Sequence, residues 1–267
     1  MDKAPGLWYN VHCIKLIMEA YALKIDLLGV SFDNVTLEEA VAAGAALAQG
    51  PGTAYAVTPN PEFILEARKN PAFRAALAGA GLTIADGIGV VYAAKILGTP
   101  LKAKVPGIDF ATGLMAELAQ AGGRLYLLGA KPGVAELAAA NLAERYPGLI
   151  LCGTHDGYFR EEESEAVAEE IRAAGADVVF VCLGAPKQEL WMEKYGQATG
   201  AHLLVGLGGS LDVFAGTVVR APQAWQKLGL EWLYRLCKEP WRWKRMIRLP
   251  LVLWCALLAR LGGKKHG

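Results

Sequence analysis

Three short polar motifs each follow an apolar run of the chain, and their residue types could do chemistry. They are Thr58-Pro59-Asn60-Pro61 after residues 55–57, Ala85-Asp86-Gly87 after residues 82–84, and the motif 184–189 after residues 178–183. Continuous apolar runs are typical of strands buried on both faces, so they predict a parallel sheet. Ligands bind outside the carboxyl ends of such strands, and we therefore expect the three motifs to form one site.

Asp86 is the best candidate for a catalytic group. A carboxylate at the end of a strand, followed by Gly87 so that other backbone can come close, suits a general base that takes a proton from a substrate hydroxyl. The alternative is that Asp86 caps a helix beginning at Gly87. Thr58 and Asn60 have a similar alternative as a turn and a helix cap, which Pro61 at a first helical position supports.

Two turns that contain glycine could place helix N-termini against phosphate groups, because backbone N–H groups and the helix dipole favour negative charge there. The turns are Gly129-Ala130-Lys131-Pro132-Gly133 and Gly206-Leu207-Gly208-Gly209. The second does not complete the dinucleotide pattern G-x-G-x-x-G, because Leu211 stands at its last position. The chain has no Walker A motif either.

The sequence predicts neither a metal site nor a cofactor. It has no Asp-x-Asp motif, and its Cys and His residues do not have metal-ligand spacing. The charge of a bound diphosphate would then have to be met by Lys or Arg side chains and helix ends. Lys104, in the loop 102–107, is a candidate for this task, and the alternative is an ordinary solvated loop lysine.

Strand patterns alternate with helix patterns along the chain. The predicted strands are 24–30, 55–57, 82–84, 124–128, 149–152, 177–183 and 202–205. One helix is predicted to start at Thr36, which opens a Thr-x-x-Glu capping box, and another to run from the turn 129–132 to Tyr146. Further helices are predicted over 62–68, 72–77, 87–97, 108–121, 161–174, 186–198 and 211–215. This alternation is typical of right-handed βαβ units, so we expect a Rossmann-like α/β sandwich with a mostly parallel sheet.

The C-terminal end differs from the rest in charge and composition. From Arg235 onward the chain has nine Lys or Arg residues and one acidic residue, which gives +8 against −7 for the rest. Four of the seven Trp residues lie after residue 226, and Pro240 should divide this segment into two helices. The apolar run 249–259 is too short to cross a bilayer, which needs about 20 apolar residues.

These features predict a helical segment that lies on an anionic membrane surface. The alternatives are a solvated helical face and a nucleic-acid surface. Nucleic acid is disfavoured because Trp and Leu fill the positions between the basic residues and the rest of the chain is acidic. We therefore predict an N-terminal extension over 1–22, an α/β domain over 23–225, and a basic, Trp-rich appendage over 226–267.

Cysteine usage and the start of the chain predict a cytoplasmic location. The five Cys residues form no C-x-x-C pair, which is typical of reduced thiols. Residues 1–20 have no clean apolar core, so they do not resemble a signal peptide.

Taken together, the motifs resemble the WecG/TagA/CpsF glycosyltransferase family over about residues 24–248. The resemblance rests on the three strand-end motifs and on residues 104–109, 206–216 and 231–236. It implies a GT-E type Rossmann-like fold and an inverting, metal-independent transfer of N-acetylmannosamine from a UDP donor. The implied acceptor is undecaprenyl-diphosphate-linked N-acetylglucosamine, at the inner face of the membrane. N-acetylmannosaminuronic acid and glucose are alternative donor sugars.

The resemblance also implies roles for particular residues. Asp86 matches the catalytic base, and Thr58, Asn60 and Gln188 match polar pocket residues near the sugar. Lys104 stands where the family usually has Arg, so it offers a point charge in place of a bidentate fork. Apart from the resemblance, we expect Gly129, Lys131, Tyr158, Gly184, Gly209 and Asp212 to bind the nucleotide, Tyr158 by stacking on the uracil and Asp212 by hydrogen bonds to the ribose or the uracil. The basic residues matched to membrane and acceptor binding are Arg235, Arg242 and Arg245.

Two other classes of function stay open on the sequence. One is a Rossmann oxidoreductase that uses NAD(P), and the other is a peripheral membrane scaffold that binds a nucleotide without turning it over. A homo-oligomer is compatible with the sequence.

Overall fold

The chain of 267 residues was analysed as a computed structural model, which describes residues 23–238, 240, 243 and 247–263. The predicted extension over residues 1–22, together with Arg242 and Arg245, lies outside the described residues.

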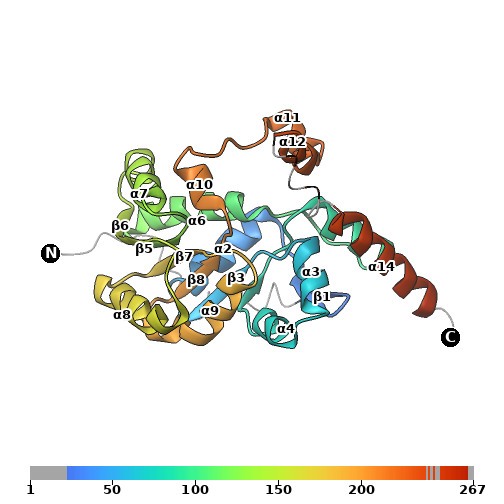
Figure 1. Ribbon diagram of the computed structural model, residues 1–267, viewed down its shortest axis with the longest axis horizontal. Coiled ribbons are helices and arrows are strands. Elements are labelled where there is room, and N and C mark those ends of the chain that lie inside the picture. The colour runs from blue at the N-terminus through green and yellow to red at the C-terminus, as the bar shows by residue number, and fades with distance from the viewer. Residues whose placement is uncertain (1–22, 239, 241–242, 244–246, 264–267) are drawn as a thin grey trace.

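A six-stranded parallel sheet forms the centre of the molecule, in the order β4-β3-β8-β7-β5-β6 (Figure 1). Its strands are β3 Ala54–Val57, β4 Leu82–Thr83, β5 Arg124–Gly129, β6 Ile150–His155, β7 Val178–Cys182 and β8 Leu203–Gly206. Every residue of β7 and β8 is buried, as the continuous apolar runs predict for strands covered on both faces. The predicted parallel sheet is therefore confirmed.

Helices cover both faces of this sheet, and alternate strand residues belong to two separate hydrophobic clusters. One face packs against α3 Pro61–Ala67, α4 Pro71–Ala78, α5 Ile88–Leu97, α8 Ser164–Ala174 and α9 Lys187–Tyr195. The other packs against α2 Leu37–Leu47, α6 Gly107–Ala121, α7 Val134–Arg145 and α10 Ser210–Phe214. In Figure 1, α6, α7 and α10 lie on one side of the strands and α8 and α9 on the other. The predicted Rossmann-like sandwich is confirmed.

Besides an N-terminal hairpin, the other elements are short 3₁₀ turns and the C-terminal helices. They are η1 Glu161–Glu163, η2 Gly196–Thr199, α11 Gln223–Lys227, α12 Glu231–Lys238 and α14 Arg248–Gly263. The predicted capping box is present at α2, where the Glu39 N–H donates to Thr36 Oγ1 and the Thr36 N–H donates to Glu39 Oε2.

The prediction of one strand over residues 24–30 is wrong. These residues begin an antiparallel hairpin of β1 Lys24–Leu27 and β2 Val30–Asp33, which forms a separate two-stranded sheet. Leu28 and Gly29 both have positive φ, at 59° and 92°, and this is the backbone geometry of a tight two-residue hairpin turn. The hairpin joins the main sheet at its edge, where Asp33 Oδ2 accepts a hydrogen bond from the Thr83 N–H at 2.7 Å.

Helix α14 packs on α3 and α5 and shares their hydrophobic core. Val252 and Ala256 are both completely buried there. A Cβ added to Gly89 of α5 would lie 2.1 Å from Leu249 Cδ1, so the two helices approach at a glycine. Arg248 forms an ion pair with Glu62 of α3 at 2.7 Å. A separate domain over 226–267 stays a prediction, but its last helix packs on two helices of the α/β sandwich.

None of the helices formed by the described residues is long and apolar enough to cross a membrane.

Val252→Asp should lower the free energy of unfolding by at least about 2 kcal/mol, because it buries an unpaired carboxylate between α14 and α5. Urea denaturation followed by circular dichroism measures this change. Leu258→Asp is the matched control on the same helix, since Leu258 is 50% exposed and the substitution should change stability by less than about 0.5 kcal/mol. Equal effects of the two substitutions would show that α14 does not pack as described.

Candidate active site at the strand ends

Every strand of the main sheet carries a predicted site residue just beyond its carboxyl end. In sheet order, Asp86 follows β4, Thr58 and Asn60 follow β3, Gly209 and Asp212 follow β8, Gly184 and Gln188 follow β7, Lys131 follows β5 just after its last residue Gly129, and Tyr158 follows β6. At about 4.8 Å between neighbouring strands, this row spans about 24 Å. The sheet thus brings the three strand-end motifs to one edge, as the sequence predicts.

Asp86 lies between the ends of two strands and the start of α6. The Gly107 N–H, the first of α6, points at Asp86 Oδ2 across 3.4 Å, and the Asp86 N–H donates to Pro59 O at 3.1 Å. The N-terminus of a 15-residue helix favours negative charge at this point. Asp86 does not cap its own helix α5, because that helix begins after Gly87 without a side-chain cap.

Lys104 lies beside Asp86 through a backbone contact. The Val105 N–H donates to Ala85 O at 2.9 Å, so the loop that carries Lys104 runs along the segment that carries Asp86. The Lys104 side chain is half-buried. The structure thus brings the backbone of this loop to the Asp86 segment, and neutralisation of substrate charge by the Lys104 side chain stays a prediction.

Thr58 joins the ends of β3 and β8. Its Oγ1 donates to Gly206 O at 3.0 Å, and the residue is 6% exposed. Its side chain also packs on Gly107, where an added Cβ would lie 3.1 Å from Thr58 Cγ2. Thr58 therefore fixes the backbone whose N–H faces Asp86.

Asn60 is the N-cap of α3, which was the alternative to a ligand-binding role for this residue. Its Oδ1 accepts from the Glu62 N–H at 2.8 Å and from the Phe63 N–H at 3.3 Å, with Pro61 at the first helical position. Since the oxygen is used in the cap, the Nδ2 group is the part left for a ligand. Sugar binding by Asn60 stays a prediction.

Gln188 is 1% exposed and lies under the turn after β8. Its Oε1 accepts from the Gly208 N–H at 3.0 Å, and its Nε2 donates to Glu189 Oε1 at 2.6 Å. The amide also packs against Gly206, where an added Cβ would lie 2.8 Å from Nε2. Both ends of the amide thus hold protein groups, and contact between Gln188 and a sugar stays a prediction.

The other end of the row is built from glycine turns and one loop. Gly129 has φ of 128°, and a Cβ there would lie 2.3 Å from Cys182 O, so only glycine fits between β5 and β7. The Gly157 N–H donates to Ala130 O at 2.9 Å and lays the loop after β6 over this turn. Tyr158, at the tip of that loop, is 71% exposed, as a ring that stacks on a base would be.

The Lys187 side chain binds the backbone of this loop. Its ammonium donates to Gly157 O at 3.2 Å and to Phe159 O at 3.3 Å, and it lies 4.4 Å from the centroid of the Phe159 ring. The ammonium is therefore engaged with the backbone on either side of Tyr158.

The roles predicted for the remaining candidates stay predictions, and the structure gives only their positions. Lys131 is exposed, Gly184 has φ of 76°, and Gly209 precedes α10. Asp212 Oδ2 lies 3.8 Å from the position of a Cβ added to Gly209. Arg235 lies on α12.

Sequence reasoning missed Arg220 as a residue of the site. Its guanidinium forms two hydrogen bonds with Asp109 in the first turn of α6, the longer at 2.8 Å, and its Nε lies 3.7 Å from Glu231 of α12. The hydrogen bonds to Asp109, together with the charges of Asp109, Glu231 and Asp86, raise the pKa of Arg220. Arg220 thus ties the C-terminal helices to the helix that begins beside Asp86.

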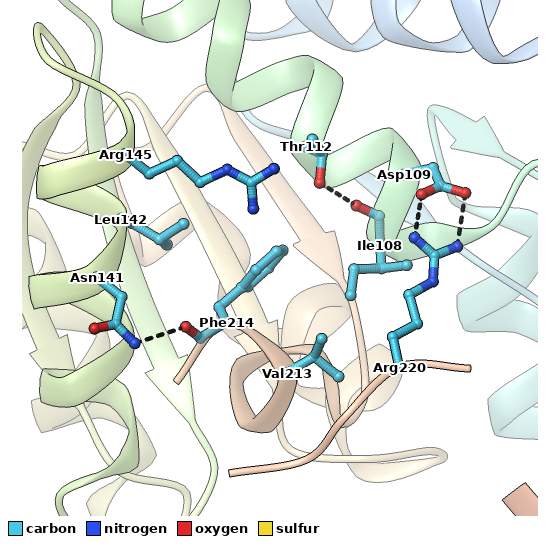
Figure 2. A pocket seen from close by; sticks show the side chains of 9 residues that line it. All are labelled: Ile108, Asp109, Thr112, Asn141, Leu142, Arg145, Val213, Phe214 and Arg220. Carbon is cyan, nitrogen blue, oxygen red and sulfur yellow. Dashed lines mark hydrogen bonds and ion pairs between the residues drawn. The ribbon is translucent and has the colours of Figure 1, made fainter. Parts of the chain in front are cut away.

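A cavity of about 420 Å³ lies beside the first turn of α6, between α6, α7 and α10. It is lined by Ile108, Asp109, Thr112, Asn141, Leu142, Arg145, Val213, Phe214 and Arg220. Figure 2 shows that Arg145 extends from α7 over the cavity toward Thr112, whereas Arg220 turns to Asp109 on the opposite wall. The cavity adjoins the Asp86 site through α6, but Asp86 itself does not line it.

A parallel sheet covered on both faces, with polar groups beyond all its strand ends, is typical of enzymes that bind a nucleotide-containing substrate. The model of the glycosyl transferase WecG/TagA/CpsF family matches residues 25–266, and the chain belongs to this family. It is therefore a glycosyltransferase, and the oxidoreductase and scaffold alternatives are wrong.

A relative from Bacillus spizizenii strain W23 is 39% identical over 214 residues, which are 80% of this chain and 82% of the relative. That protein is named N-acetylglucosaminyldiphosphoundecaprenol N-acetyl-beta-D-mannosaminyltransferase.

Thr58→Val should lower the free energy of unfolding by about 1–3 kcal/mol, because the isosteric side chain removes the donor from a buried carbonyl. Thermal and urea denaturation measure the loss. Thr112→Val is the matched control, since Thr112 Oγ1 donates to Ile108 O inside α6, and it should change stability by less than about 0.5 kcal/mol. A loss at Thr58 no larger than at Thr112 would contradict the bridging role of Thr58.

Proposed function

We propose that the protein transfers N-acetylmannosamine from UDP-N-acetylmannosamine to undecaprenyl-diphosphate-linked N-acetylglucosamine. The observation that carries this proposal is the position of Asp86 at the β4 end of a row of polar strand ends, facing the N-terminus of α6. The relative from Bacillus spizizenii, which is named for this transfer, supports the choice of donor and acceptor.

The proposed reaction is a single displacement with inversion. The acceptor hydroxyl gives its proton to an Asp86 oxygen as its own oxygen bonds to the anomeric carbon of the donor. The bond from that carbon to the diphosphate breaks with its electron pair, and UDP leaves. Lys104 and helix N-termini offset the charge that develops on the diphosphate, which is the usual way in which fixed charges stabilise a transition state.

The reaction is proposed to be independent of metal. In the part of the chain that the structure describes, no three His, Cys, Asp or Glu side chains lie together in a group that could hold a metal ion. The donor sugar is the finer part of the proposal, because N-acetylmannosaminuronic acid and glucose need similar hydroxyl contacts and one side chain can decide between them.

We also propose that the protein is cytoplasmic and acts on the inner face of the membrane, bound through its C-terminal segment. The outer face of α14 carries a stripe of exposed apolar side chains at helical spacing. Leu251 is 46% exposed, Trp254 58%, Leu258 50% and Leu261 56%. Such a stripe is typical of a surface that meets a partner or a lipid interface. With the net charge of +8 from Arg235 onward, an anionic lipid surface is the partner it fits.

Purified protein should release UDP from UDP-N-acetylmannosamine only when lipid-linked N-acetylglucosamine is present, and Asp86→Asn should lower turnover by about 10²–10⁴-fold. Substitution by Asn removes the proton acceptor while keeping the shape, so titration calorimetry should show that UDP binding is largely kept. Turnover is measured by UDP release, with the three candidate donors assayed in parallel.

Asp26→Asn is the matched control, because Asp26 is an exposed carboxylate of the β1–β2 hairpin that accepts its hydrogen bond from the Gly29 N–H within the hairpin turn. It should leave turnover within about twofold of wild type. If Asp86→Asn behaves like this control, Asp86 is a structural residue and the mechanism is wrong. Faster turnover with another donor would move the proposal to that sugar.

Replacing Arg235, Arg242 and Arg245 together by Glu should shift the protein from anionic vesicles to the supernatant. Each Lys or Arg near such a surface contributes about 1 kcal/mol of attraction, and the substitutions turn three attractions into repulsions. Sedimentation with vesicles at low and high salt measures binding. Activity on a long-chain lipid acceptor should fall in parallel.

The control has the same charge change at three exposed positions elsewhere, Arg74, Arg160 and Arg172. This variant should still sediment with the vesicles. Unchanged sedimentation of the C-terminal variant would show that the apolar stripe of α14 anchors the chain alone, or that the basic residues serve another partner.

A further inference from the structure

Glu189 is a completely buried carboxyl with one hydrogen-bond partner in the described chain. Its Oε1 accepts from Gln188 Nε2 at 2.6 Å, whereas its Oε2 has no hydrogen-bond partner among the described residues. Burial raises the pKa of this carboxyl to about 7. An incompletely paired buried carboxyl destabilises a fold, so its contribution to stability does not account for its presence in α9.

Glu189 and the Gly208 N–H together select which way the Gln188 amide faces. With Nε2 on Glu189, the amide oxygen is directed at the Gly208 N–H, from which it accepts at 3.0 Å. An amide turned by half a rotation would set its NH₂ group against the Gly208 N–H, donor against donor, and its oxygen against Glu189. Without the acceptor on Glu189, the Gly208 N–H alone would select the first orientation, and Nε2 would lose its partner.

The turn after β8 connects the Gln188 amide to the surroundings of Asp86. Gly206 O, at the start of that turn, accepts from Thr58 Oγ1 at 3.0 Å. The Thr58 side chain packs on Gly107, whose N–H faces Asp86 Oδ2 at 3.4 Å. A continuous series of hydrogen bonds and packing contacts therefore links Glu189 to the predicted general base.

We propose that Glu189 is a positioning residue for glycosyl transfer: it orients the Gln188 amide, and through it the turn 206–209 and the Thr58–Gly107 contact beside Asp86. The predicted effect on activity rests on the proposed function, whereas the predicted effect on the conformation of the turn holds for any reaction.

Glu189→Met, which keeps the length and removes the acceptor, should lower kcat/KM about 10–100-fold, because small misplacements of reacting groups have effects of this size. Its melting temperature should stay unchanged or rise, since the substitution removes an incompletely paired buried group. Glu189→Gln keeps an acceptor oxygen and should restore activity to within about threefold of wild type. If Glu189→Met loses stability in proportion to activity, or if Glu189→Gln is as impaired as Glu189→Met, the inference is overturned.

A double-mutant cycle with Gln188→Met tests the route of the effect. If Glu189 acts through Gln188, the double variant should be no less active than Gln188→Met alone, whereas additive losses would contradict the proposal. Hydrogen exchange of the segment 206–209, followed by mass spectrometry, separates this inference from the proposed function. Exchange there should rise in Glu189→Met and not in Glu189→Gln, whichever sugar the enzyme transfers, and unchanged exchange would overturn the inference.

Discussion

The hydrogen bond from Thr58 Oγ1 to Gly206 O joins two residues that are 148 positions apart in the chain. It lies where β3 meets β8, and this pairing joins the N-terminal strands β3 and β4 to the C-terminal strands β5 to β8. The bond is buried, so water could not replace the hydroxyl as a donor to the Gly206 carbonyl if the bond were lost. The placement of Asp86 depends on this seam, because Thr58 also packs on Gly107 and Gly107 faces Asp86.

The C-terminal helices attach to the same region from two sides. Helix α14 packs on α5, which begins two residues after Asp86, and Leu249 lies against Gly89 in the first turn of α5. On the other side, Arg220 connects Asp109 in the first turn of α6 with Glu231 on α12. Both helices that begin beside Asp86 are thus held by the C-terminal part of the chain. The C-terminal helices therefore contact the same two helices, α5 and α6, that begin beside the predicted base.

The sequence predicted the sheet and the meeting of its strand-end motifs, because both follow from local signals. Runs of apolar residues mark buried strands, and a parallel sheet collects their carboxyl ends at one edge. The burial of Gln188 was missed because it depends on the absence of a side chain at Gly206. These two residues are distant in the sequence, and no local pattern shows that they touch. The pair of Asp109 and Arg220 spans 111 residues, and no pattern within a window links them. The hairpin was missed because Leu28 adopts a positive φ that is rare for leucine.

The order of the strands also arranges the predicted groups in the order of the parts of a nucleotide sugar. Asp86 follows the strand β4, and Thr58 and Asn60 follow its neighbour β3, whereas Gly129 ends β5 and Tyr158 follows β6 at the opposite end. A UDP-sugar laid along the row with its sugar at β3 would extend its nucleotide toward Tyr158. The acceptor hydroxyl would then approach from the β4 side, where α5 and α14 lie. The exposed apolar stripe is carried by α14, which packs on α5, so under the proposed function a lipid-linked acceptor and the predicted base would meet at the same end of the sheet.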